Sequence, residues 1–84
     1  MSSEVQHYVI ITGQGARAAS GLARRTYAEA GPIDETLRKD LSWRLDSAIV
    51  EWEYGDLGAE LIKISEQEAE SLMQAFQARW ERGS

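Results

Sequence analysis

With 84 residues and a mass of 9.4 kDa, the chain can bury one small hydrophobic core, so we expect a single domain over residues 1–84. Its 43% hydrophobic and 27% charged residues are typical of a globular protein and exclude a disordered one. The absence of cysteine excludes disulfides and thiolate zinc sites. The apolar run Tyr8–Ile11 is too short for a secretion signal or a membrane span, so we expect a soluble cytoplasmic protein without membrane contact.

The net charge of −5 is concentrated in one stretch of the chain. Residues 51–70 hold seven carboxylates and a single cation, Lys63, whereas the charges of the other residues nearly cancel. A concentrated field of one sign steers association with partners whatever the fold beneath it. The charge distribution therefore bears on the partners of the protein more than on any reaction that it catalyses.

Residues 5–12, with the sequence VQHYVIIT, predict a buried strand because they are rich in β-branched and aromatic side chains and end at Gly13. Residues 16–30 are mostly good helix formers with apolar residues at helical spacing, and we expect a helix that ends at Gly31 and Pro32. Gly21 weakens a helix, however. The alternative is that residues 22–30 return as a second strand, hairpinned to the first.

Residues 33–45 carry an apolar side chain at every fourth position: Ile33, Leu37, Leu41 and Leu45. This spacing predicts a second amphipathic helix, with Asp34 and Glu35 in the first turn, where the helix dipole favours negative charge. Trp43 would then lie on the far side of that helix or beyond its end.

Residues 48–54 alternate, with Val50, Trp52 and Tyr54 on one side and glutamates on the other, which predicts a half-buried strand. The turn GDLG at residues 55–58 would return the chain into residues 59–64 to form a hairpin. In that register Glu53 stands directly opposite Glu60.

Ser65-Glu66-Gln67-Glu68 matches a capping box, in which the serine and the glutamate three residues later satisfy each other's free amides. A last helix is expected to follow and to bury one apolar stripe. Its members are Ala69, Leu72, Met73, Phe76 and Trp80. The expected architecture is thus an α+β fold, a small antiparallel or mixed sheet of about three strands packed against helices, in the order β-α-α-β-β-α.

One candidate site is a glycine turn. Gly13-Gln14-Gly15-Ala16-Arg17-Ala18 follows a predicted strand and opens a predicted helix, where backbone amides can approach a phosphate. Arg24 and Arg25 would lie near Arg17 on that helix and add positive charge. Gly13, Gly15, Arg17, Arg24 and Arg25 are therefore the alternative phosphate-binding set. Three arginines on an acidic protein are a poor basis for nucleic-acid binding, which we do not favour.

The segment from Tyr8 to Gly31, YVIITGQGARAASGLARRTYAEAG, resembles the opening of a short-chain dehydrogenase, with Thr-Gly after the first strand and a later Ser-Gly-Leu. The resemblance covers 24 of 84 residues. Six residues separate Gly13 from Ser20, where that family has a tighter turn, and no tyrosine is followed by a lysine four residues on, as the family's catalytic pair requires. The chain is also too short for a six-stranded nucleotide-binding fold. We therefore expect neither dehydrogenase activity nor a cofactor.

A second candidate site is the acidic hairpin face, with partner-binding residues Glu51, Glu53, Asp56 and Glu60. Like charges on paired strands repel. Either the register differs, or a cation such as Arg17 or Arg24 lies between them, or the face binds a basic partner; simple solvation of polar strand positions is the plain alternative. Alternate strand residues lie about 6.6 Å apart, near the spacing of successive phosphates, so the face could imitate nucleic acid.

No catalytic or metal-binding set stands out. His7 is the only histidine and lies in a predicted strand without a nucleophile motif nearby, and no compact Asp-x-Asp loop accompanies the glutamates. We therefore expect a non-enzymatic module that binds another protein with a basic surface. A phage-type or mobile-element inhibitor or regulator is one concrete form, and a nucleotide or nucleic-acid binder or a structural homodimer are the alternatives.

Overall fold

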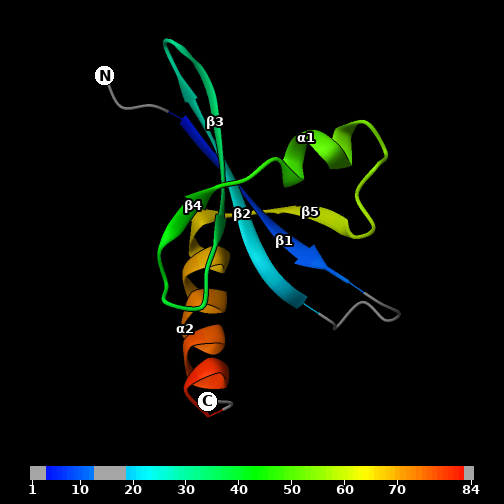
Figure 1. Cartoon of the computed structure of the whole chain (residues 1–84). Helices are drawn as coiled ribbons and strands as arrows, with labels where there is room; N and C mark the ends of the chain where they lie inside the picture. Colours follow the sequence, from blue (N-terminus) through cyan, green and yellow to red (C-terminus); the bar gives the residue numbers. More distant parts are fainter. Residues whose placement is uncertain (1–3, 13–18, 83–84) are drawn as a thin grey trace.

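The computed structural model describes residues 4–12 and 19–82, and over these ranges five strands form one antiparallel sheet in the order β4-β3-β2-β1-β5 (Figure 1). In chain order the elements are β1 (Glu4–Ile11), β2 (Ala19–Ala28), β3 (Gly31–Leu37), β4 (Trp43–Leu45), α1 (Ala48–Glu53), β5 (Glu60–Ile64) and α2 (Glu66–Arg82). The expected sheet of about three strands and the order β-α-α-β-β-α are wrong. Two segments expected as helices are strands, and one expected as a strand is a helix.

Strand β2 occupies most of the segment expected as a helix, and it pairs antiparallel with β1 on one side and β3 on the other. Leu22 and Ala23 are fully buried although they are neighbours in sequence, because β2 is a central strand with packing on both sides. Tertiary burial therefore overrides the helix propensity of this segment. Gly31 was expected to end a helix; it has a positive φ, 125°, and lies where the turn after β2 leads into β3.

The four-residue repeat at 33–45 does not mark a helix. A spacing of four is close to one helical turn but is also an even number, and even spacing keeps strand residues on one face. Ile33 and Leu37 lie on the same face of β3, Leu41 lies in the turn that follows, and Leu45 ends β4. Trp43, which a helix would have placed elsewhere, pairs with Leu37 and packs into the core.

Helix α1 replaces the first strand of the expected hairpin. Ala48 and Ile49 are buried and Trp52 is half-buried, which is a helical spacing of inward positions, whereas Tyr54 is 78% exposed. The predicted pairing of Glu53 with Glu60 is therefore absent, since β5 pairs with β1.

The two helices cover opposite faces of the sheet. Tyr8 and Ala23 pack with Ile49 of α1, whereas the adjacent residues Val9 and Leu22 pack with Phe76 of α2. Since successive strand residues point to opposite faces, β1 and β2 contribute to two separate clusters. In Figure 1, α2 extends below the sheet beside the β3–β4 hairpin while α1 lies at the other end.

Helix α2 agrees with the sequence prediction in position and in its inward stripe. Ala69 and Phe76 are buried, and Leu72, Met73 and Trp80 are half-buried and pack on the α2 face of the sheet. Phe76 and Trp80 stack with ring centroids 5.3 Å apart. No helix within residues 4–12 and 19–82 has the length and apolar character needed to cross a membrane.

Candidate functional site

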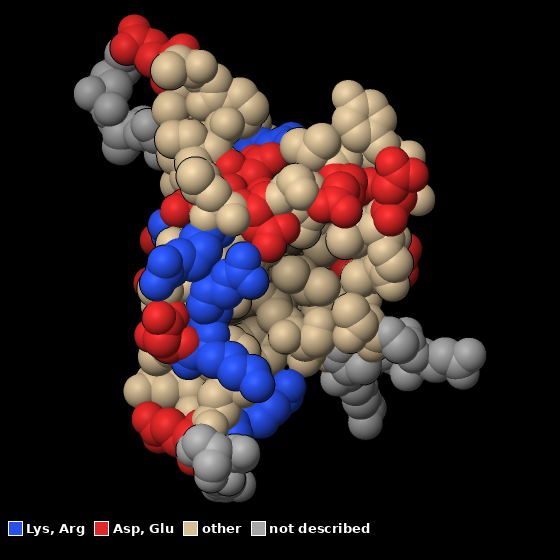
Figure 2. Space-filling model, viewed as in Figure 1, with Lys and Arg blue, Asp and Glu red and all other residues tan. Residues whose placement is uncertain are grey.

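The four predicted acidic residues lie on one continuous segment, which we call the acidic arm: α1, the loop after it and the first residue of β5, residues 48–60. Glu51 and Glu53 are on α1, Asp56 is in the loop, and Glu60 starts β5. All four are exposed. Figure 2 shows acidic side chains gathered over the α1 end of the molecule. The strand geometry with phosphate-like spacing is wrong, because two of the four belong to a helix.

Arg25 of β2 fixes the end of the arm to the sheet. Its Nε and Nη2 donate to the two carboxylate oxygens of Asp34 at 2.7 and 2.9 Å, and its Nη1 and Nη2 donate to those of Glu53 at 3.1 and 3.0 Å. These hydrogen bonds, with Asp34 first and Glu53 second, raise the pKa of Arg25 above its ordinary value. Glu53 remains 48% exposed at its side chain, but its main partner is internal. It is therefore partly structural, which its sequence position alone did not indicate.

The other three carboxylates of the arm have no ion pair among the residues the structure describes. Glu51 accepts a hydrogen bond from the Ser47 hydroxyl, which leaves its charge uncompensated. Asp56 and Glu60 are exposed, and no lysine or arginine occurs between Arg44 and Lys63. The arm therefore presents Glu51, Asp56 and Glu60 to solvent as net negative charge.

Two apolar side chains on the same segment as these carboxylates are exposed. Tyr54, at the end of α1, is 78% exposed, and Val50 is 37% exposed. The sequence pattern placed both with Trp52 on a buried strand face, so Tyr54 is a surface residue that sequence reasoning missed. An exposed tyrosine supplies apolar area and a hydroxyl at little entropic cost, which is characteristic of interface anchors.

Comparisons with known proteins return no match. No protein-family model fits the chain, and no curated protein and no solved structure is significantly similar to it. A functional conclusion must therefore come from the residues of this chain.

The alternative phosphate-binding set is not brought together among the described residues. Arg24 and Arg25 are neighbours on a strand, so they point to opposite faces. The Arg24 Nε donates to Glu35 at 2.9 Å, and its guanidinium lies 4.2 Å from the centroid of the Trp43 ring. Arg25 is held by Asp34 and Glu53 as above. Gly13, Gly15 and Arg17 lie outside the described residues, so the glycine turn stays a prediction.

His7 lies at the edge of the α2 face, in a small hollow that it lines with Val5, Arg24 and Glu66. Burial and then the charge of Arg24 lower the pKa of His7, and Glu66 and Glu70 oppose that effect. Its ring meets the Trp43 ring edge-on at 6.1 Å. No nucleophile faces it, and no group of three or more potential metal ligands occurs in the parts of the chain that the structure describes.

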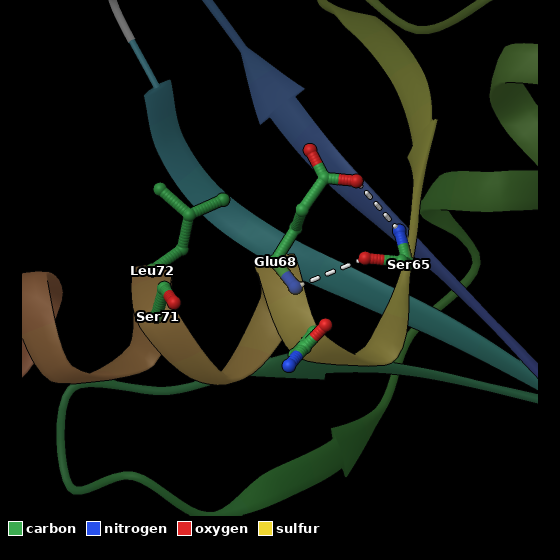
Figure 3. Close-up of a pocket in the computed structure, with 5 residues that line it drawn as sticks. Ser65, Glu68, Ser71 and Leu72 are labelled. Carbon is green, nitrogen blue, oxygen red and sulfur yellow. Dashed lines mark hydrogen bonds between the residues drawn. The ribbon is translucent and has the colours of Figure 1, made fainter.

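An open depression of about 490 Å³ lies beside the start of α2. Figure 3 shows Ser65 and Glu68 facing each other there, with Ser71 and Leu72 about one turn further along the helix. The Ser65 hydroxyl accepts from the Glu68 amide and the Glu68 carboxylate accepts from the Ser65 amide, each at 3.1 Å. The capping box predicted from the sequence is confirmed, and it uses the polar atoms of this depression.

Proposed function

We propose that the protein is a non-enzymatic module that binds another protein, and that the acidic arm is its docking surface for a basic partner. One observation supports this most: Glu51 and Asp56 carry uncompensated charge on the same short segment as Tyr54, which is 78% exposed, and Glu60 follows at the start of β5. Carboxylates at the rim steer a basic partner and select against acidic ones, while the aromatic side chain supplies buried area on contact.

Glu53 has a different role from the one its sequence position suggested. Its contact with Arg25 holds α1 against the sheet, so it positions the arm and leaves only part of its charge for a partner. A cytoplasmic inhibitor or regulator that covers a nucleic-acid-binding surface is a form of this function that fits the charge.

The test is co-purification from host cells with three versions of the chain. The first is unaltered, the second carries Glu51→Lys, Asp56→Lys and Glu60→Lys, and the third is a control with Glu4→Lys, Glu29→Lys and Glu70→Lys. The control makes the same change of net charge at exposed positions outside the arm. We expect basic proteins to be captured by the unaltered chain and the control and lost from the arm variant. Equal capture by all three at physiological salt would exclude the arm as a docking surface.

Tyr54→Ala tests the anchor without changing charge. Removing a central aromatic side chain from an interface costs about 2 kcal/mol or more, so capture should fall by more than tenfold. Leu45→Ala is the matched control, because Leu45 is 75% exposed but lies outside the arm. Loss of capture with Leu45→Ala and not with Tyr54→Ala would place the contact elsewhere.

A further inference from the structure

A second charged surface, of opposite sign, lies on the same side of the molecule as the acidic arm (Figure 2). We call it the basic strip: Arg38 and Lys39 after β3, Arg44 on β4 and Arg79 on α2, all exposed. Figure 2 shows positive side chains running from the β3–β4 hairpin towards the end of α2, on the same side of the molecule as the acidic side chains over α1. Residues 36–45 hold three cations and one carboxylate, and residues 46–62 hold five carboxylates and no cation.

Arg38 and Arg44 of the basic strip form only exposed ion pairs, whereas Arg79 donates to the Ala19 carbonyl at 3.1 Å and lies 5.2 Å from the Phe76 ring centroid. Arg38 lies 3.2 Å from Asp46 with half of its side chain exposed, and Arg44 lies 3.8 Å from Asp40 with both side chains more than 60% exposed. Such exposed pairs contribute between about 0 and 1 kcal/mol, so a partner carboxylate can replace them at little cost. This contrasts with Arg25, whose side chain is 11% exposed and doubly bound.

The arrangement of the two surfaces fits one kind of partner. In a two-fold dimer the same patch of each copy forms the interface, and residue i of one copy meets residue j of the other while j meets i. A patch with an acidic half beside a basic half is complementary to itself after such a rotation. The chain segment that joins the basic strip to the acidic arm is also short, since β4 ends at Leu45 and α1 begins at Ala48.

We propose that the chain forms a two-fold symmetric dimer in which the acidic arm of each copy lies on the basic strip of the other. This inference rests on the part of the proposed function that makes the arm a docking surface for positive charge, and it assigns that charge to the basic strip of a second copy of the chain. An interface of standard size takes about 800 Å² from each partner. The accessible surface of the chain is 6001 Å², so one face of the molecule is large enough for such an interface.

The net charge of −5 on each copy does not prevent this association. The molecule extends over 39 × 29 × 20 Å, so the centres of two touching copies lie about 20 Å or more apart, which exceeds two Debye lengths of about 8 Å at physiological salt. Repulsion between the whole molecules is therefore largely screened, whereas carboxylates and guanidinium groups in contact are not. Burial of Tyr54 and Val50 adds a contribution that salt does not weaken.

A charge exchange tests the inference. One variant reverses the arm with Glu51→Lys and Asp56→Lys, and a second reverses the strip with Lys39→Glu and Arg44→Glu. The mass in solution is measured by light scattering and sedimentation at low and high protein concentration. We expect the unaltered chain to reach twice its 9.4 kDa at high concentration and each variant alone to stay at 9.4 kDa. An equimolar mixture of the two variants should recover the doubled mass, because each reversed surface then meets its opposite.

A control with Glu29→Lys and Glu70→Lys changes the net charge as the arm variant does and should dimerise like the unaltered chain, and circular dichroism establishes that every variant is folded. Recovery in the mixture cannot arise from misfolded variants. A mass of 9.4 kDa for the unaltered chain at every concentration would overturn the inference, and so would a mixture that fails to recover the dimer. If the chain is monomeric but the arm reversal still abolishes capture of basic host proteins, the dimer is wrong and the proposed function stands.

Discussion

Arg25 is the residue on which the position of the acidic arm depends. Its guanidinium joins three elements, since it lies on β2 and binds Asp34 of β3 and Glu53 of α1. Planar two-oxygen contacts of this kind need the fork geometry of arginine, which lysine lacks. The side chains of Arg25 and Asp34 are each 11% exposed, so the pair is mostly desolvated.

Arg25→Gln should destabilise the fold by about 3 kcal/mol, because it leaves the carboxylate of Asp34 buried without its partner. Arg44→Gln is the control. Its pair with Asp40 is more than 60% exposed on both sides, so this change should cost no more than about 1 kcal/mol. Urea unfolding followed by circular dichroism gives both values. Equal midpoints for the two variants would mean that the Arg25 contacts contribute no more than an exposed pair.

His7 makes stability depend on pH near neutrality. Burial and the nearby charge of Arg24 lower the pKa of His7 in the folded state, despite the opposing charges of Glu66 and Glu70. The unfolded chain, with a pKa near 6.5, then binds the proton more readily than the folded one, so stability falls as pH drops through the unfolded value.

We expect the urea midpoint to decrease between pH 7.5 and pH 5.5, above the range in which ordinary carboxylates titrate. His7→Gln should remove most of this decrease, since the chain has no other histidine. A decrease of the same size in the variant would assign the pH dependence to other groups.

At the level of the elements, the first turn of α2 is stabilised by the capping box between Ser65 and Glu68. Ser65→Ala removes the hydroxyl that accepts from the Glu68 amide and should cost about 1 kcal/mol. Ser71→Ala on the exposed side of the same helix is the control, and it should be neutral or slightly stabilising because alanine is the better helix former. Thermal unfolding compares the two. A loss for Ser71→Ala as large as for Ser65→Ala would show that the cap is not the cause.

The elements that the sequence predicted well are those defined by local chemistry. The capping box and the stripe from Ala69 to Trp80 lie within one segment, so α2 needed no knowledge of its neighbours. The β-branched run of β1 is similarly self-sufficient. Strand β2 forms because it is buried between β1 and β3 and covered by helices on both faces. This burial depends on other segments of the chain, so the residues of β2 alone do not predict it.

The sequence predictions for β3 and α1 were wrong because the spacing of their apolar residues fits both a helix and a strand. Ile33 and Leu37 satisfy a four-residue repeat that a strand face and a helix face both allow. Over α1 and the residue that follows it, Ile49 is buried and Tyr54 is exposed, so the alternating and the helical interpretations compete within six residues. The acidic residues are exposed, as their charge led us to expect. Their spacing was predicted wrongly, because it depends on whether residues 48–53 form a strand or a helix.

On the scale of the whole molecule, the sheet divides the protein into parts of unequal stability. Strands β1 and β2 are central and packed on both faces, whereas α1 is a helix of six residues, too short to be stable without tertiary packing. It depends on Ile49 and on the contact between Glu53 and Arg25. The proposed docking surface therefore lies on a short element whose attachment rests on a few contacts, as is common for binding segments, and the central strands hold the residues to which it is attached.

Hydrogen exchange should resolve this difference. We expect amides of α1 to exchange far faster than those at Leu22 and Ala23, which should open only when the whole molecule unfolds. In Glu53→Gln, exchange in α1 should accelerate further while β1 and β2 keep their protection, because the change weakens a charge-assisted contact at the end of the arm. Uniform acceleration throughout the sheet would mean that α1 and the sheet open as one unit. In that case the arm could not reorganise on binding without unfolding the protein, and docking would have to use the surface as it stands.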